Sequence, residues 1–383
     1  MRKNIILSGF IFFCLQNINS QVLEKTIEKI NSLHNVSYKV NFYQLMFDRE
    51  STDTLDSYIK IIGDEKGGGL FKIKTSYSTL LYDGNRKVEL MPWDSSYRSE
   101  VYKNEGSQIE RSSLMYWSKI FATYLKSPEH ITYLPDTIIN NKKYFHLVYH
   151  HKNIYGKNTF LKLNIVIDRK SFLPYQLMQE EQTFINRDIP AHLIFKYGYF
   201  DYKINQKEFP DLSIIDIPPY FVSAEKKREL TNQLKTPPLN IGAIAPDFEL
   251  PDVDDKMVRL KNIGNNKAVL IEFTFIGCVP CLAVIPTVKK IRKKYKGSDL
   301  EILSIYHQES STKEEVVKLI NKYELSGIVE LLKGDAIAEQ YHIQGSPTFF
   351  LVDKNGKIAG YKLGLSDDLE EQLIEKIDRV LDQ

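Results

Sequence analysis

The spacing of hydrophobic residues separates the chain into a first part rich in strand patterns and a second part in which strands and helices alternate. Residues 22–33 place apolar side chains at intervals of three and four, which predicts a helix. From Val36 to Phe42 apolar and polar residues alternate, as in a half-buried strand. A second helical pattern covers residues 112–125, and further strand patterns cover residues 57–62, 70–75, 77–82, 87–91, 144–150, 159–167, 175–183 and 192–204. The first part is therefore predicted to be an α+β domain, a curved antiparallel sheet with helices on one face.

The second part begins after a polar, helix-prone stretch at residues 224–235. Thr236-Pro237-Pro238 then stops a helix and forms a stiff link, so we expect one domain at residues 21–235 and another at residues 236–383. In the second domain the expected strands are 268–275, 301–306, 349–352 and 357–362, and the expected helices are 282–295, 312–323, 335–341 and 367–381.

The first twenty residues have the pattern of a secretory signal peptide. Met1-Arg2-Lys3 is basic, and an apolar run at residues 5–15 leads to a polar stretch that ends near Ser20–Gln21, where we expect cleavage. The run is short for a membrane span of about 20 residues, although an uncleaved anchor stays an alternative. Bulky residues before Cys14 argue against its lipidation. Residues 1–20 therefore predict export to the periplasm or cell envelope, with a soluble chain after cleavage.

Composition and charge exclude some classes of function. The chain has 51 basic and 49 acidic residues, and it is 43% hydrophobic and 26% charged, which is typical of a globular protein. Because the two signs balance, the composition argues against nucleic acid as a partner.

The use of cysteine is informative in an exported chain. Apart from Cys14 in the signal segment, the chain has only Cys278 and Cys281, in a Cys-x-x-Cys pair. A structural disulfide and half of a zinc site are the simplest alternatives to a redox centre. A zinc site needs two further ligands. The chain has no second cysteine pair, and His307 and His342 do not have the paired spacing of zinc ligands. We therefore expect no metal.

The position of this pair between a strand and a helix favours redox chemistry. The partial positive charge of a helix N-terminus stabilises a thiolate at Cys278, and the thiolate is the attacking species in disulfide exchange. Cys281 lies one turn further along and can close the disulfide. Pro280 has no N–H and stiffens the first turn. Cys278 is therefore expected to be the exposed, more acidic thiol and Cys281 the buried one.

Glu272 interrupts the apolar strand six residues before Cys278. Burial disfavours the charged carboxylate, so the pKa of Glu272 should be raised. A carboxyl group of this kind can take the proton of the resolving cysteine. The alternative is an edge strand on which Glu272 faces solvent, but the neighbouring residues are apolar.

The first domain resembles periplasmic lipoprotein carriers of the LolA/LolB type. The resemblance lies in the initial helix with its strand meander and in the segments LYDGNRKV at Leu81–Val88 and NIVIDRKSFLP at Asn164–Pro174. It implies a curved, incomplete barrel that holds acyl chains. We therefore expect an apolar cavity and a hydrophobic ligand in this domain.

Residues from about 241 onward resemble the TlpA/ResA-type proteins of the AhpC/TSA-like superfamily. The resemblance is carried by Ala245–Leu250, by the strand leading to the Cys-Val-Pro-Cys motif, and by Gly345–Thr348. It implies an α/β thioredoxin fold with Cys278 as nucleophile, Cys281 as resolving cysteine, Glu272 as buried acid and Pro347 as a cis-proline facing the disulfide. One residue departs from the pattern, because Gly277 stands where such proteins usually have Trp.

These features predict an exported thiol-disulfide oxidoreductase that reduces or isomerises disulfides of envelope proteins without a bound cofactor. Val279-Pro280 adds no charge to stabilise the thiolate, so we expect a low-potential dithiol that receives electrons from a membrane thiol reductase.

The sequence leaves two alternative functions. The chain could be a lipid or lipoprotein carrier with an accessory thioredoxin domain, or a thiol peroxidase. Peroxidases of this superfamily have a Pro-x-x-x-Thr-x-x-Cys motif, whereas Ile271 and Phe275 occupy its first two positions here.

Overall fold

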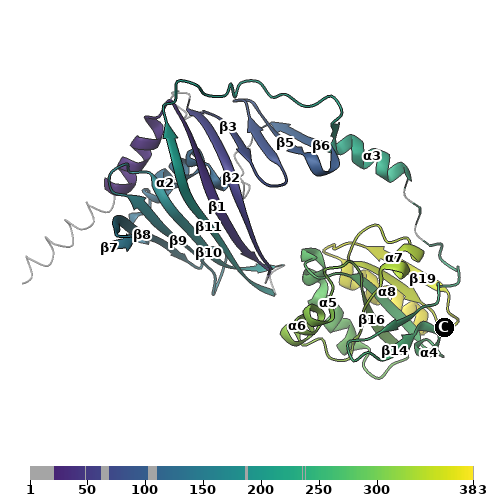
Figure 1. Ribbon diagram of the computed structural model, residues 1–383. Coiled ribbons are helices and arrows are strands. Elements are labelled where there is room, and N and C mark those ends of the chain that lie inside the picture. Colours follow the sequence, from purple (N-terminus) through teal and green to yellow (C-terminus); the bar gives the residue numbers. More distant parts are fainter. Residues whose placement is uncertain are drawn as a thin grey trace, which may run out of the picture. The chain divides into compact units, whose positions relative to one another are not determined.

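The computed structural model describes residues 21–47, 49–61, 69–101, 110–185, 189–234, 236–237 and 239–382. They form two compact units, of which unit 1 is built mainly from residues before Leu234 and unit 2 mainly from residues after it (Figure 1). The expected signal peptide at residues 1–20 lies outside the described residues. Among the helices that are described, none is both long and apolar enough to cross a membrane.

Unit 1 is organised around a 12-stranded sheet with the order β12-β6-β5-β4-β3-β2-β1-β11-β10-β9-β8-β7. The central strand β1 pairs with β2 and with β11 in antiparallel fashion, and β12 pairs with β6 in parallel. The strands are β1 Asn35–Met46, β2 Arg49–Ile61, β3 Gly69–Lys74, β4 Thr79–Tyr82, β5 Arg86–Met91, β6 Ser96–Val101, β7 Ile131–Ile139, β8 Lys142–Lys152, β9 Phe160–Asp168, β10 Pro174–Ile185, β11 Ile189–Ile204 and β12 Val222–Ser223.

Three of these strands have no counterpart in the sequence analysis. β6 is mostly exposed and polar, so its residues do not alternate in hydrophobicity. β7 contains Pro135, which lacks the N–H of a ladder residue, and its register against β8 shifts between Leu134 and Thr137. β12 is only two residues long.

Helices cover one face of this sheet. Residues 21–31 are helical, and α2 spans Leu114–Tyr124, with the Ser113 side chain accepting a hydrogen bond from the Met115 N–H at its start. Trp117 and Phe121 of α2 are fully buried, and the Trp117 ring packs against both Phe121 and Tyr197 of β11. The alternation predicted for β1 places its apolar residues in the same core. Aromatic side chains therefore fill space between α2 and the sheet.

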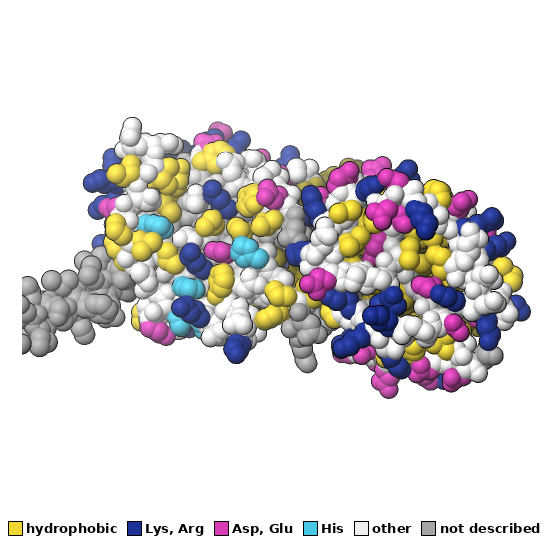
Figure 2. All heavy atoms as spheres, turned by 90° about the horizontal axis from the view of Figure 1, so that it is seen from below, with side chains coloured by type: hydrophobic (Ala, Val, Ile, Leu, Met, Phe, Trp, Pro, Cys, Tyr) yellow, Lys and Arg dark blue, Asp and Glu magenta, His cyan; other side chains and the backbone are white. Residues whose placement is uncertain are grey.

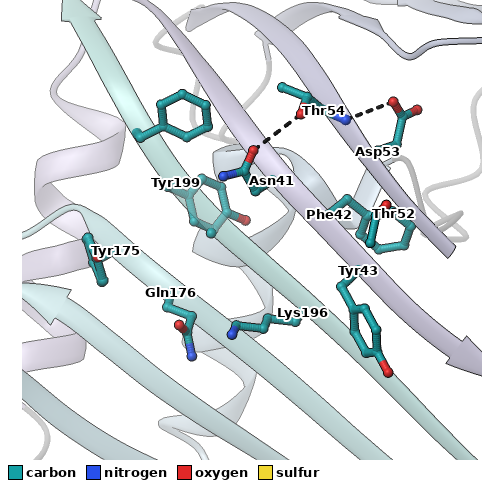
Figure 3. Close-up of a pocket in the computed structure, with 12 residues that line it drawn as sticks. Asn41, Phe42, Tyr43, Thr52, Asp53, Thr54, Tyr175, Gln176, Lys196 and Tyr199 are labelled. Atoms are coloured by element: carbon teal, nitrogen blue, oxygen red, sulfur yellow. Dashed lines mark hydrogen bonds between the residues drawn. The ribbon is translucent and has the colours of Figure 1, made fainter. Parts of the chain in front are cut away.

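The depression shown in Figure 3 differs from the expected apolar cavity. It has a volume of about 700 Å³ and is lined largely by residues of the opposite sheet face, whose side chains alternate with those of the core. Asn41, Gln176 and Lys196 contribute polar groups, and the Thr54 hydroxyl donates a hydrogen bond of 3.3 Å to Asn41 Oδ1. Five aromatic side chains also line it, so the depression combines polar with aromatic groups.

Unit 2 contains a five-stranded sheet with the order β17-β16-β15-β18-β19, and a separate hairpin of β13 and β14. β15, β16 and β17 are parallel, whereas β18 runs antiparallel to β15 and β19 antiparallel to β18. The elements are β13 Glu249–Pro251, β14 Met257–Arg259, α4 Leu260–Ile263, β15 Ala268–Thr274, α5 Val279–Lys294, β16 Leu300–Tyr306, α6 Lys313–Tyr323, β17 Val329–Leu331, α7 Asp335–Gln340, β18 Thr348–Val352, β19 Ile358–Leu363 and α8 Leu369–Leu381; α3, Ala224–Leu234, precedes them.

Every residue of the central strand β15 is buried because both sheet faces are covered. Ala268 and Leu270 pack in a core with residues of α5 and α8. Ile271 and Phe273 belong to the opposite core, which includes Tyr341. The continuous apolar run of β15 reflects this two-sided burial. A charged residue on β15 is consequently placed inside the protein.

Candidate active site

The cysteine pair lies where β15 passes into α5. Cys278 is the N-cap residue of α5, and its Sγ accepts a hydrogen bond of 3.2 Å from the Cys281 N–H. Gly277 before it has a φ of 88°, a left-handed conformation that strains residues with a Cβ. This geometry accounts for the glycine at the position where the sequence departs from the pattern it resembles. A sulfur held by an N-terminal N–H group of a helix is favoured as a thiolate.

Cys278 and Cys281 form a disulfide, with Cα atoms 5.1 Å apart. Both residues are 4% exposed, so in this oxidised form exposure does not distinguish them, contrary to the expectation for Cys278. The reason on the Cys278 side is a close contact with another loop, because its Sγ lies 3.6 Å from the carbonyl oxygen of Ser346. The roles of Cys278 as nucleophile and Cys281 as resolving cysteine stay a prediction.

The contacting loop carries the predicted proline. The Ser346–Pro347 peptide bond is cis, and Thr348 begins β18 directly after it. The Ser346 side chain also contacts His307, with Oγ 2.9 Å from Nε2. The fold therefore brings the Cys-x-x-Cys motif and the Gly-Ser-Pro-Thr segment together, although 68 residues separate Cys278 from Ser346.

His307 is a further polar residue of this site, and the sequence analysis considered it only as a zinc ligand. It follows β16 directly, its N–H donates to the Thr274 carbonyl oxygen at 3.1 Å, and its ring packs against Phe275. Burial lowers the pKa of His307. The sequence feature that could have revealed His307 is its position directly after a parallel strand. The carboxyl ends of neighbouring parallel strands meet at one edge of the sheet, where the cysteine pair also lies.

Glu272 lies behind the disulfide, on the face of β15 that α5 covers. It is 6% exposed, and burial raises its pKa to about 8. The Ser304 hydroxyl donates a hydrogen bond of 3.4 Å to its Oε2. Glu272 and Cys281 line the same small cavity of about 20 Å³. Because β15 lies between β16 and β18, the edge-strand alternative for Glu272 is wrong.

A second buried acid, Glu330, was not recognised from the sequence. It is the middle residue of β17 and is 4% exposed, and burial raises its pKa to about 7. The signal was the same as for Glu272, a single carboxylate in an apolar run. It was missed because β17 has only three residues, too few for a periodic pattern.

The described part of the chain shows no cluster of side chains suited to a metal ion, and the face drawn in Figure 2 carries both signs of charge. In the described ranges, no three or more His, Cys, Asp and Glu side chains are grouped so that they could hold a metal ion. On the face seen in Figure 2, basic and acidic side chains are interspersed.

Comparison with known proteins gives the site a family. The AhpC/TSA family model matches residues 241–361. The thiol-disulfide oxidoreductase ResA of Bacillus thuringiensis (strain Al Hakam) is 33% identical over 135 residues, which are 35% of this chain and 75% of that protein. This chain belongs to the ResA family of thiol-disulfide oxidoreductases. ResA of Geobacillus kaustophilus (strain HTA426) is 30% identical over 135 residues, 35% of this chain and 76% of that protein.

Membership of the ResA family confirms the expected enzyme class and the thioredoxin-like fold of unit 2. Among solved structures, the thioredoxin domain of a thiol-disulfide oxidoreductase from Bacteroides vulgatus is 29% identical, covers 36% of this chain and 99% of its own, and has a TM-score of 0.33.

Proposed function

We propose that this ResA-family chain is an exported oxidoreductase whose Cys278–Cys281 dithiol reduces or isomerises disulfides of envelope proteins. The observation that carries the proposal is the position of Cys278, at the N-cap of α5 and in contact with the loop of Pro347. The helix end favours the thiolate, and the backbone of Ser346 beside it can pair with an extended segment of a partner protein.

The proposed reaction has two exchange steps. The Cys278 thiolate attacks a sulfur of the substrate disulfide, which forms a mixed disulfide and releases one substrate sulfur as a thiolate. Cys281 then loses its proton and attacks Cys278 Sγ, so that the Cys278–Cys281 bond forms and the second substrate sulfur leaves. Two electrons pass from the dithiol to the substrate. Glu272, which lines the same cavity as Cys281, accepts the proton in its ionised form.

The direction of the reaction is proposed to be reductive, without a bound cofactor. Val279 and Pro280 bring no charged group to the thiolate, so its stabilisation comes from the helix end alone. Ionised Glu272 would repel the thiolate and so disfavour it, mainly at alkaline pH, because the pKa of Glu272 is raised to about 8. A low-potential dithiol needs a supply of electrons, for which we propose a membrane thiol reductase.

The remaining domain assignments support this setting. Residues 1–20 are proposed as a signal peptide that leads to the periplasm or cell envelope, residues 21–235 as a LolA-like domain and residues 236–383 as the thioredoxin-like domain. The LolA-like assignment is supported by the sheet with helices on one face. The aromatic rings that fill this interior argue against a carrier of acyl chains as the main function.

Reduction of insulin disulfides by the full chain tests the proposed function. We expect activity with a thiol reductant as electron source, and its loss in Cys278→Ser. The Cys281→Ala variant should retain the first exchange step and accumulate mixed disulfides, whose partners mass spectrometry of an envelope extract would identify. Equal activity of Cys278→Ser and the unaltered chain would refute the proposal.

A further inference from the structure

Glu330 occupies a position at which a carboxyl group has no structural benefit of its own. It is buried, and neither carboxyl oxygen makes a hydrogen bond within the described part of the chain. Ser304 and Tyr306 lie near enough to lower its pKa, yet the net effect of burial is to raise it. An uncompensated buried carboxyl group destabilises a fold, so its presence calls for an explanation in the chemistry of the site.

The strand register places Glu330 in one row with Glu272. Glu272 of β15 is opposite Ser304 of β16, and Ser304 is opposite Glu330 of β17. Residues opposite one another in neighbouring strands point to the same sheet face. This is the face that α5 covers, and the Ser304 hydroxyl bridges toward Glu272 Oε2. The two acids therefore flank one serine beneath the active-site helix.

The neighbourhood of the two acids contains no positive charge among the residues that line the cavity. Cys281 faces it from α5, and Glu272, Thr274, Ser304 and Tyr306 face it from the sheet. The remaining lining side chains are apolar: Phe275, Leu282, Ile285, Val288, Leu319, Leu325 and Ile328. The groups there that can titrate besides Glu272 and Glu330 are Cys281 and Tyr306, and burial raises the pKa of Tyr306 well above its usual value. Among the described residues, Glu330 is therefore the one charged group that raises the pKa of Glu272 besides burial.

We infer that Glu330 is a positioning residue of the redox centre, which acts through Glu272 by keeping that carboxyl group protonated in the resting enzyme and basic enough to exchange a proton with Cys281. The inference rests on the proposed function, in which Glu272 serves Cys281. Glu330 itself touches neither the substrate nor the sulfur atoms. Its carboxylate repels a second negative charge in the same low-dielectric space.

The need for such a residue follows from matching of proton affinities. A thiol has a pKa near about 8.5 and an ordinary glutamate near about 4.3, so an ordinary carboxylate is too weak a base to take the thiol proton efficiently. Burial and, after it, the charge of Glu330 raise the pKa of Glu272 to about 8, close to that of the thiol. The pair then titrates as a unit, because both carboxyl groups cannot easily ionise together.

The proton balance assigns a place to each group. As Cys281 attacks the mixed disulfide, its S–H bond breaks and the proton passes to the Glu272 carboxylate. The Cys278–Cys281 bond forms, and the substrate sulfur leaves with the electron pair of the broken bond and takes a proton from water. When the enzyme is reduced again, protonated Glu272 returns the proton to Cys281. Glu330 changes the equilibrium of both transfers without exchanging a proton with sulfur.

A titration of the oxidised full chain tests the inference without relying on catalysis. Glutamate labelled with ¹³C at the side-chain carboxyl would be followed by NMR against pH, with Glu272→Gln identifying the Glu272 signal. We expect Glu330→Gln to lower the pKa of Glu272 by about one unit or more, a tenfold change in proton affinity. Glu371→Gln, at an exposed position of α8, is the matched control and should leave it unchanged. If Glu330→Gln does not fold, Glu330→Met replaces it, since its side chain is similar in length and apolar.

A kinetic arm separates this inference from the proposed function. The rate of insulin reduction is measured against pH, and the part of the profile that disappears in Glu272→Gln is assigned to Glu272. In Glu330→Gln this part should shift to lower pH. When Glu330→Gln is added to Glu272→Gln, the profile should not shift further. An unchanged Glu272 titration in Glu330→Gln, or an equal shift of the profile with and without Glu272, overturns the inference. Equal insulin-reduction activity of Cys278→Ser and the unaltered chain refutes the proposed function instead. The NMR titration still decides the role of Glu330 in that case.

Discussion

At the scale of single residues, burial without a counter-charge governs the acids behind the disulfide. The pKa of Glu272 is raised from 4.5 to about 8 and that of Glu330 to about 7. The folded protein therefore holds protons that the unfolded chain has released between about pH 4.5 and pH 8. Stability from these groups is fully present below pH 4.5 and is lost as the pH rises through the folded-state values.

We predict that the free energy of unfolding of unit 2 decreases from about pH 5 to pH 8 in the oxidised protein. Each unit of pKa difference corresponds to about 1.4 kcal/mol, so the loss should amount to a few kcal/mol. Glu272→Gln should flatten this dependence. Hydrogen exchange of β15–β17 peptides in denaturant is the suitable measurement, because Trp93 and Trp117 both belong to unit 1 and tryptophan fluorescence would report on that unit. A flat profile in the unaltered chain would contradict the prediction.

The two cysteines should differ once the disulfide is reduced. Cys278 is the N-cap residue, whereas Cys281 is within the first turn of α5 and faces the cavity of Glu272. We predict that Cys278 is alkylated first and at lower pH, because the helix N-terminus lowers its pKa. Mass spectrometry of the reduced chain after brief exposure to iodoacetamide across pH would show this. Faster labelling of Cys281 would reverse the assignment.

At the scale of elements, the turn from β15 into α5 depends on one backbone conformation. Gly277 has a φ of 88°, which a residue with a Cβ adopts at a cost of about 1 kcal/mol. We predict that Gly277→Ala destabilises unit 2 by roughly that amount and slows insulin reduction, since the start of α5 would shift. Gly345→Ala is the control for stability, because Gly345 has an ordinary φ and an added Cβ would meet only Leu363 Cδ1 at 3.9 Å. Equal stability of the two variants in denaturant unfolding would count against this account.

At the scale of the whole molecule, the redox potential decides the direction of electron flow. With no charged residue between the cysteines, the potential should lie nearer to that of thioredoxin, about −270 mV, than to that of a strong oxidant, about −120 mV. Equilibration of the full chain with glutathione buffers, followed by thiol trapping, would measure it. A value at the oxidant end would make the chain an oxidase of envelope thiols and remove the need for a membrane reductase.

The sequence alone determined those features that local pattern encodes. The Cys-x-x-Cys pair, the helix after it and the Gly-Ser-Pro-Thr segment are contiguous in the chain, and the oxidoreductase class and thioredoxin-like fold that they indicated are confirmed by the family. The burial of Glu272 followed from the apolar run around it, because such a run is covered on both faces.

Tertiary structure alone decided which distant residues meet. The row of Glu272, Ser304 and Glu330 exists only through the register of β15, β16 and β17, which no single segment specifies. His307 reaches Ser346 for the same reason, since separate strands bring both to one edge of the sheet. In unit 1, Trp117 and Phe121 pack against the sheet because the helix carrying them lies on that face, and the apolar cavity expected in this domain stays a prediction. Alternation shows that a side chain points inward, whereas the packing of other elements determines what it meets.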